Sequence, residues 1–438
     1  MFRKNILAIA LSAMVALSLT ACGGGGGTPP PVDTGTTTDT GTTTDTSTPG
    51  GLDSNTKVDL TMLAAIYSDS TKTLWQGYID AFTALHPNIT ITLDMQSWEN
   101  INNVIKTQVQ AGQAPDILSI DAFSAYAQDD LLYSADEILS PATIADFQPS
   151  FVANATMNGK QYGFPLIASA RALMINNDIF QAAGLDPNNP PKTWDDLKAD
   201  AQAIKDLNKG YYGYGMPLGS EEAQAELAMW ILGNGGSYGD ATTLTINTPA
   251  NVEAVQYMKS LIDAGLTQPD AGSTMRTPMI NNLFMQGKIG MAIGLPPFVG
   301  MFASQAPDLH YTLAPMPTKT GQPATLGVAD HLMAFNKGDA NKGAAIGAFL
   351  DFFYQADNYV KFVDTEGFLP VTKSGAAGTT HTEFAIFNQL LPNASFYPSI
   401  NPKWGQTQGL IQQNIGTIAQ GKDPAQVLKD IQTASDAL

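Results

Sequence analysis

The sequence contains few of the residues that build metal sites or bind nucleic acids. Its 438 residues include one cysteine, Cys22, and four scattered histidines, which leave no disulfide framework and little material for a zinc site. Arginine is scarce, with Arg171 and Arg276 the only two beyond Arg3. Lysine and arginine together number 22 against 40 aspartates and glutamates, and the formal net charge is -18. We therefore expect no metal, no cofactor and no nucleic-acid partner.

Long apolar runs are also lacking after the first twenty residues. Arg3 and Lys4 precede an apolar stretch from Ile6 to Leu19 that is too short to span a bilayer comfortably, which is typical of an export signal. The tetrad Leu-Thr-Ala-Cys that ends at Cys22 resembles the bacterial lipobox, in which the cysteine becomes the lipidated first residue of the mature protein. Residues 1–22 are therefore predicted to be a signal peptide, with acyl chains on Cys22 as a membrane anchor. The alternative is a chance cysteine beside an ordinary cleavage site.

Residues 23–56 have almost no large apolar side chain. They consist mainly of Gly, Thr, Pro and Asp, and the hexad TGTTTD occurs twice between Thr34 and Asp45. A segment of this composition cannot offset its ordering entropy by burial. We expect a disordered stalk between the anchor and the folded part of the chain.

From Val58 onward the hydrophobic pattern alternates between the strand period and the helix period. A strand begins at Val58, and a helix follows it behind Ser70, which we expect to cap that helix. A second strand and helix come next, and a third strand runs from Asp116 to Asp121. Two successive strand–helix–strand units predict an α/β fold with a parallel sheet, whose ligand crevice lies beyond the carboxyl ends of the strands. Further along, Thr193 is expected to cap another helix, and the chain after Phe335 is predicted to be almost entirely helical.

The motifs of common enzyme classes do not occur. The sequence has no HExxH, no GxSxG, no Walker loop and no GxGxxG after a strand. Instead, it resembles the extracellular solute-binding proteins of ABC importers, specifically the sugar-binding group typified by maltose-binding protein. The resemblance covers Val58 to the C-terminus and rests on segments that follow the family's order: AFTALHPNITITL, QAGQAPDILSID, NGKQYGFPLIASARALMINNDIFQAAGLD, PPKTWDDLKADA, FMQGKIGMAIGLPPF, LAPMPTKTGQP, LGVADHLMAFNK, EGFLPVTKS and GKDPAQVLKDIQ.

The resemblance implies the two-lobe α/β fold of the type II periplasmic binding proteins, with a ligand cleft between the lobes. One lobe is expected at 57–166 plus 326–372, and the other at 167–325 plus 373–438. The implied function is capture of a di- or oligosaccharide by hinge closure and its delivery to the membrane subunits of an ABC importer. The implied protein is a monomeric receptor without enzymatic activity. It faces the periplasm or the cell exterior and is attached to the membrane through its lipid anchor only.

A sugar site needs flat apolar faces for the ring and charged or amide groups that hydrogen-bond the hydroxyls. Candidates of both kinds follow strands at the edge where the crevice is expected, namely Tyr67, Asp69, Asp121 and Phe123. Asp69 has an alternative role as a helix cap beside Ser70. The resemblance places a ligand-binding acidic or aromatic residue in the loop that contains Asp121 and Phe123.

Further candidates come from the middle of the chain. Arg171 lies in an otherwise apolar run, LIASARALMI, and either binds the ligand or pairs with a buried carboxylate. Glu222 and Trp230 belong to a helix from which relatives direct side chains toward the cleft, although Trp230 also suits the core. Phe298 lies in the segment GLPPF, where the family commonly has GPW. This departure puts a stacking platform of the maltose type in doubt.

The segments GVADHL and NPKW supply the last candidates, Asp330, His331 and Trp404. The resemblance expects an aromatic wall of the site at Trp404. Trp98 is compatible with either a core or a ligand-binding role.

Two other functions remain open at this stage. The first is a secreted enzyme that acts on polysaccharide with two acidic residues, such as Asp69 and Asp121, as acid and base. The second is a binding protein for a polyol, an amino sugar or a sugar phosphate.

Overall fold

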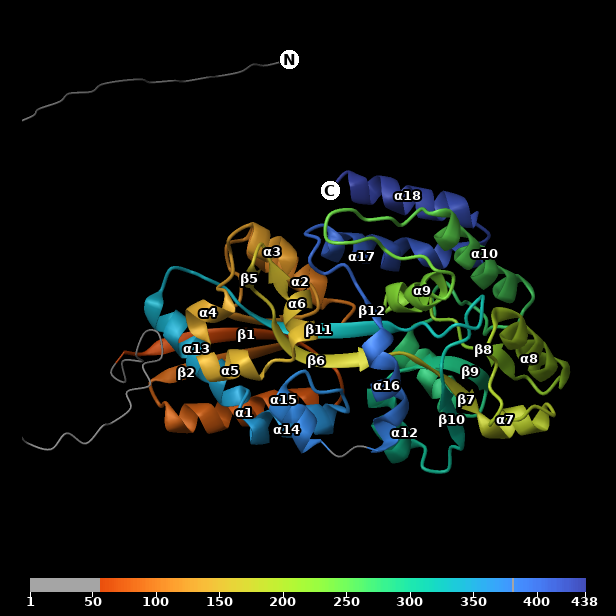
Figure 1. Cartoon of the computed structure of the whole chain (residues 1–438), viewed down its shortest axis with the longest axis horizontal. Coiled ribbons are helices and arrows are strands. Elements are labelled where there is room, and N and C mark those ends of the chain that lie inside the picture. The colour runs from red at the N-terminus through yellow and green to blue at the C-terminus, as the bar shows by residue number, and fades with distance from the viewer. Residues whose placement is uncertain (1–55, 380–381) are drawn as a thin grey trace, which may run out of the picture. The chain divides into compact units, whose positions relative to one another are not determined.

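The computed structural model describes residues 56–379 and 382–438 and arranges them around two β-sheets (Figure 1). The predicted signal peptide, the lipidation site Cys22 and the stalk up to residue 55 lie outside the described residues. Among the described helices, none combines the length and the hydropathy that a membrane span requires.

The first sheet has six strands in the order β12-β11-β3-β1-β2, and β6 also pairs with β11. β1 is parallel to β2 and β3, as the alternating pattern predicted, whereas β11 runs antiparallel to both β3 and β6. The sheet is therefore mixed and not purely parallel. Its strands are β1 (Val58–Ala65), β2 (Ile89–Gln96), β3 (Ile117–Ile120), β6 (Phe164–Ala170), β11 (Leu326–Ala334) and β12 (Ser395–Phe396).

The second sheet has the strand order β10-β7-β9-β8. β7 is antiparallel to both β9 and β10, and β8 is parallel to β9. A separate two-stranded hairpin joins β4 and β5. The bounds of these strands are β7 (Ala172–Asn176), β8 (Tyr212–Tyr214), β9 (Ile289–Gly294), β10 (Tyr311–Ala314), β4 (Thr156–Met157) and β5 (Lys160–Gln161).

Helices cover the faces of both sheets, and α1, α13 and α14 lie together on one face of the first sheet (Figure 1). The helices that accompany the first sheet are α1 (Thr71–Leu85), α2 (Ile101–Gln110), α3 (Ser124–Gln128), α4 (Ala135–Ile138), α5 (Pro141–Asp146), α6 (Pro149–Asn154), α13 (Ala340–Phe353), α14 (Ala356–Glu366), α15 (Lys373–Gly378), η2 (Thr382–Phe384), α16 (Ala385–Leu390) and η3 (Leu391–Asn393).

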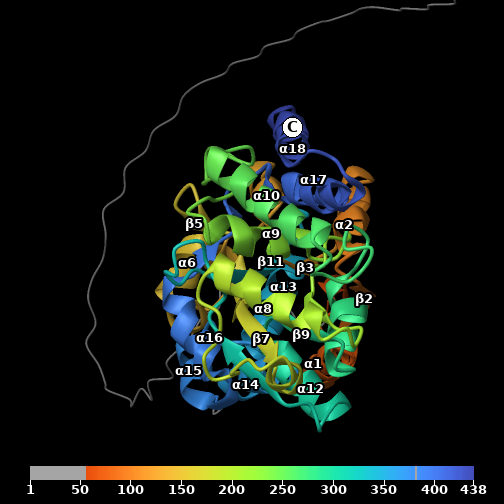
Figure 2. The same ribbon diagram turned by 90° about the vertical axis from the view of Figure 1, so that its right-hand side faces the viewer.

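Around the second sheet, α9, α10, α17 and α18 form a layer of neighbouring helices (Figures 1 and 2). The helices on this side are α7 (Asn177–Ala182), α8 (Trp194–Asp206), α9 (Ala223–Leu232), α10 (Pro249–Asp263), η1 (Arg276–Asn281), α11 (Asn282–Met285), α12 (Pro296–Gln305), α17 (Trp404–Asn414), η4 (Ile415–Gln420) and α18 (Pro424–Asp436). η1 is a π-helix, and η2, η3 and η4 are 3₁₀ helices.

The predicted helix caps have different outcomes. Thr193 caps α8 as expected, because its hydroxyl accepts the N–H of Asp196 and the Asp196 carboxylate accepts the N–H of Thr193. The prediction of a Ser70 cap is wrong, since the Ser70 side chain makes no capping bond. The hydroxyl of Thr71 instead accepts the backbone N–H groups of Tyr67 and Ser68, which orders the turn between β1 and α1.

The chain passes between the cores of the two sheets at three places. It leaves the first sheet at Arg171, the single residue between β6 and β7, and returns between β10 and β11. The third change follows β12, because Phe387 and Leu390 of α16 still pack in the core of the first sheet, whereas Trp404 packs in the core of the second. The sequence placed this last division at 372/373, too early in the chain.

Candidate functional site

A cavity of about 90 Å³ lies between side chains from both sheets. Tyr67, Trp98 and Asp121 line it from just beyond the ends of β1, β2 and β3, which is the predicted crevice. Pockets for small molecules typically measure roughly 300–1,000 Å³. A ligand that needs a pocket of this size can therefore enter only when the walls of the cavity separate. The other lining residues are Ile167, Ser169, Arg171, Glu221, Glu222, Gln224, Thr277, Leu295, Pro297, Phe298, Val328, Asp330, Phe368, Tyr397, Gln408 and Gln412.

Two buried carboxylates, Asp121 and Asp330, face this cavity with 4% and 3% of their surface exposed. They come from neighbouring strands, because β11 pairs with β3 through His331 and Ile120. Burial and the nearby Asp121 carboxylate raise the pKa of Asp330 to about 8, and burial also raises the pKa of Asp121. A carboxyl group with a pKa near 8 is largely protonated at neutral pH.

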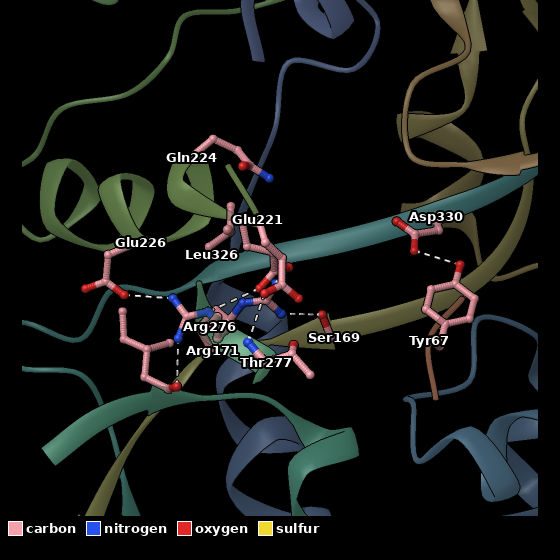
Figure 3. Close-up of polar contacts among 12 residues, drawn as sticks. Tyr67, Ser169, Arg171, Glu221, Gln224, Glu226, Arg276, Thr277, Leu326 and Asp330 are labelled. Carbon is pink, nitrogen blue, oxygen red and sulfur yellow. Dashed lines mark hydrogen bonds and ion pairs between the residues drawn. The ribbon is translucent and has the colours of Figure 1, made fainter. Parts of the chain in front are cut away.

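Aromatic rings form the wall next to Asp330. The Tyr67 hydroxyl donates a 2.8 Å hydrogen bond to Oδ2 of Asp330 (Figure 3). The Tyr67 ring lies 5.7 Å from the ring of Trp98 and 4.9 Å from the ring of Phe368, between centroids. Such a surface presents both ring faces and hydrogen-bonding groups to a ligand.

Arg171 is held by partners on both sides of the crossing between the sheets. Its Nη1 donates to the Ser169 hydroxyl and its Nη2 to Oε1 of Glu222, each at 2.8 Å. Oε2 of Glu222 also lies 3.2 Å from Nε of Arg276. Arg276 in turn binds Glu226 at 2.7 Å (Figure 3). Both guanidinium groups are therefore neutralised by carboxylates of this network.

The two glutamates at the start of α9 connect this network to the π-helix η1. Glu222 precedes α9 with φ of 59°, a left-handed conformation that is strained for a residue with a side chain. Oε2 of Glu221 accepts the backbone N–H of Thr277 in η1 at 3.0 Å. Strain and a π-helix both occur often at functional sites.

The family model described as bacterial extracellular solute-binding protein matches residues 67–360. The chain belongs to this family. A binding protein of Brucella abortus is 35% identical over 391 residues, which cover 87% of this chain and 93% of that protein. The maltotriose-binding protein of Pyrococcus abyssi is 24% identical over 364 residues, which cover 80% of this chain and 75% of that protein.

A solved structure of the same class supports the fold of this solute-binding protein. The maltose-bound MalE3 protein of T. maritima superposes with a TM-score of 0.75 at 19% identity, covering 87% of this chain and 99% of that one. The fold is therefore the two-lobe α/β fold of the periplasmic solute-binding proteins, as predicted. Each sheet with its helices forms one lobe.

The structure brings together part of the predicted site. The predicted residues that line the cavity are Tyr67, Asp121, Arg171, Glu222, Phe298 and Asp330. Arg171 also has the alternative role that the sequence suggested, because it pairs with the Glu222 carboxylate.

The two predicted tryptophans do not reach the cavity. Trp230 is fully buried, and its indole N–H donates to Oε1 of Glu226 at 2.9 Å. Trp404 is also fully buried, with its ring centroid 5.0 Å from that of Tyr397 and 5.1 Å from that of Tyr238. Both belong to the core of the second lobe, so the expected aromatic wall at Trp404 is corrected: Tyr397, which packs on Trp404, lines the cavity instead.

Three other predicted residues are likewise absent from the lining. Phe123 and His331 are fully buried and meet edge to face, with their ring centroids 5.4 Å apart. Burial lowers the pKa of His331 to about 4, and Nδ1 of its neutral ring lies 3.2 Å from the carbonyl oxygen of Asp121. His331 therefore contacts the backbone of Asp121 and does not itself line the cavity. Asp69 is exposed before α1, so it does not face Asp121 across the cavity.

Several lining residues are not predicted by the sequence. Trp98 is compatible with either a core or a ligand-binding role, and Ser169 lies in a run of apolar residues, after the buried Ile167 and Ala168, that gives no sign of a polar site. Gln408 and Gln412 are one helical turn apart in α17, and that spacing is the only signal that could have paired them. Within the described ranges, no group of three histidine, cysteine, aspartate or glutamate side chains could hold a metal ion.

Proposed function

We propose that this solute-binding protein captures a sugar of di- or oligosaccharide size outside the cytoplasmic membrane and delivers it to an ABC importer, without catalysing a reaction. The observation that carries the proposal is the cavity itself, in which carboxylates and amides face aromatic rings. Rings stack on the apolar face of a pyranose, and the polar groups pair with its hydroxyls. Relatives that bind maltotriose and maltose support the same ligand class.

Closure of the lobes around the ligand is part of the proposal. The lining comes from both lobes, and the Ser220 hydroxyl donates to Oε1 of Glu99 across them at 3.2 Å. A ligand that touches both walls gains contacts only when the walls are together, so it favours the closed state by its differential affinity.

Binding and closure are tested together on the purified protein. Titration calorimetry against maltose, cellobiose and their trisaccharides identifies a ligand, and chromatography of the same samples shows whether any sugar is cleaved. We expect binding without cleavage, and a smaller radius of gyration by small-angle scattering when the ligand is bound. Cleavage would favour the enzyme, and an unchanged radius with a tight ligand would rule out closure.

The charges of the cavity argue against a phosphorylated sugar. Four acidic residues line it, namely Asp121, Glu221, Glu222 and Asp330, while the lining cation Arg171 is already paired. A phosphate would meet several acidic side chains, and the lining guanidinium, that of Arg171, already has a carboxylate partner. The Asp69–Asp121 pair of the enzyme hypothesis is likewise unsupported, because Asp69 lies outside the cavity.

We further propose that acyl chains on Cys22 hold the exported protein at the membrane. Cys22→Ser is expected to move the protein from the membrane fraction to the soluble fraction, because no acyl chain can then be attached. Cell fractionation measures this change, and ligand affinity serves as the control, since residues 23–56 separate Cys22 from the folded part. Continued retention of the variant in the membrane fraction would show that Cys22 is not the anchor.

A further inference from the structure

The cavity contains acceptor atoms that no group of the described chain satisfies. Oδ1 of Asp121 and Oδ1 of Asp330 are both buried without a hydrogen-bond partner. Oδ2 of Asp330 accepts a hydrogen bond from the Tyr67 hydroxyl, so Oδ1 is the carboxyl oxygen that lacks a hydrogen-bond partner. A buried acceptor without a donor is costly, and the cost rises when the acceptor is ionised. The ligand therefore has to supply donors at this end of the cavity.

The two arginines near this pair form ion pairs with other carboxylates. Nη1 and Nη2 of Arg171 donate hydrogen bonds to Ser169 and Glu222, and Arg276 binds Glu222 and Glu226. Within the described part of the chain, no lysine or arginine forms an ion pair with Asp121 or Asp330. The two carboxyl groups therefore face the cavity without an ion-pair partner from the described residues, and a cation placed between them would stabilise their ionised forms.

We propose that the sugar bound by this protein carries a protonated amino group, which lies between the carboxylates of Asp121 and Asp330. This inference rests on the proposed sugar-binding function and specifies the class of sugar. An ammonium group supplies three donors and a positive charge, so it satisfies both unpaired oxygens at once. The Tyr67 hydroxyl binds Asp330, and the rings of Trp98 and Phe368 that contact the Tyr67 ring also line the cavity, where aromatic faces attract a cation.

The proposed position of the ammonium group predicts a second measurable effect, the release of protons from Asp330 when the ligand binds. The charged and titratable groups around Asp330 are Tyr67, Asp121, Arg171 and Glu222. With the pKa of Asp330 at about 8, this carboxyl is largely protonated in the empty protein at pH 7. A cation placed beside it stabilises the carboxylate, lowers that pKa and displaces the proton. Binding of an amino sugar at pH 7 therefore releases protons, whereas a neutral sugar leaves the proton on Asp330.

The experiment compares sugars that differ only by an ammonium in place of one hydroxyl per ring. The matched pairs are glucosamine and glucose, galactosamine and galactose, and the glucosamine β-disaccharide and cellobiose. Titration calorimetry at pH 7 is run in phosphate and in Tris, because the difference in apparent enthalpy between these buffers counts the protons released. In at least one pair we expect the amino sugar to bind about tenfold more tightly or better, with proton release.

Variants locate the effect at the pair. Asp330→Asn and Asp121→Asn keep the side-chain volume, and each should reduce the preference for the amino sugar by about tenfold. Asp330→Asn should also abolish the proton release. Glu221→Gln is the control, because it removes one negative charge from the cavity lining without touching the pair. A thermal melt of each variant confirms folding.

The outcomes separate this inference from the proposed function. If a neutral sugar binds as tightly as its amino counterpart or more tightly, the inference is overturned while sugar binding stands. If no member of any pair binds but another neutral sugar of the first panel does, the inference is likewise overturned while sugar binding stands, and if no sugar of either set binds, both are overturned. If the amino sugar is preferred but Glu221→Gln reduces the preference as much as the two aspartate variants, the ammonium does not lie between Asp121 and Asp330.

Discussion

Arg276→Met is expected to lower the free energy of unfolding by about 3–5 kcal/mol, since it leaves a buried carboxylate without its partner. Arg276 and Glu226 are both fully buried, and their side chains meet at 2.7 Å. Nη1 of Arg276 also donates to the carbonyl oxygen of Ile293 in β9 at 2.9 Å, so one side chain ties η1, α9 and the second sheet together. Urea denaturation followed by tryptophan fluorescence measures the loss.

A double variant tests whether the uncompensated charge is the cause. Glu226 keeps two donors in Arg276→Met, the Tyr214 hydroxyl and the Trp230 indole N–H. Adding Glu226→Gln removes the negative charge but retains an oxygen for these donors, and it should restore much of the lost stability. A double variant that is no more stable than the single one would contradict this explanation.

An ion pair on the surface of the same lobe provides the matched control. Lys319 and Glu253 meet at 2.6 Å, but their side chains are 45% and 50% exposed. Lys319→Met should leave the unfolding curve unchanged within error, because solvent screens exposed pairs. Equal losses for Lys319→Met and Arg276→Met would show that burial does not set the strength of these pairs.

Trp404→Ala is expected to destabilise the fold by about 3–5 kcal/mol, the usual cost of removing a large buried aromatic side chain. The side chain is fully buried and packs against Tyr238 and Tyr397. Because Tyr397 lines the cavity, the variant should also weaken ligand binding indirectly. Thermal and urea denaturation measure the loss in the free energy of unfolding.

Trp98→Ala is the companion change at the cavity wall. This indole is only partly buried and contacts the Tyr67 ring, so its removal should weaken sugar binding about tenfold with little loss of stability. Calorimetry with the ligand found in the panel measures the affinity. If Trp404→Ala folds normally and Trp98→Ala does not, the roles of these two tryptophans are reversed.

The periodicity of the sequence was sufficient for the local elements of the first lobe. Val58, Leu60 and Met62 alternate because one face of β1 is buried, and Tyr78 and Phe82 recur at helical spacing because one face of α1 is buried. Leu85, which the same spacing placed on that face, is 67% exposed. Parallel strands end at the same edge of a sheet, so Tyr67 and Asp121 could be assigned to one crevice. These inferences need only short-range patterns and one rule of topology.

The sequence did not predict which charged residues form ion pairs with each other. The unusual Arg171 indicated a partner, but 51 residues separate it from Glu222, and 50 separate Glu226 from Arg276. The partner of a buried guanidinium is decided by which helix packs over the crossing, and this is a non-local outcome of the fold. The sequence therefore predicted that Arg171 needed a partner, either the ligand or a buried carboxylate, without identifying Glu222.

The sequence by itself determined the family, the α/β class and the strand-end residues Tyr67 and Asp121, because these follow from local patterns along the chain. The tertiary structure alone decided which aromatic residues line the cavity. Trp404 begins α17 and Trp98 lies in the turn before α2, and nothing in their immediate neighbours distinguishes a core indole from a cavity wall. Burial depends on which distant side chains cover a ring, and Tyr238 and Tyr397 cover Trp404 while Trp98 remains at the cavity.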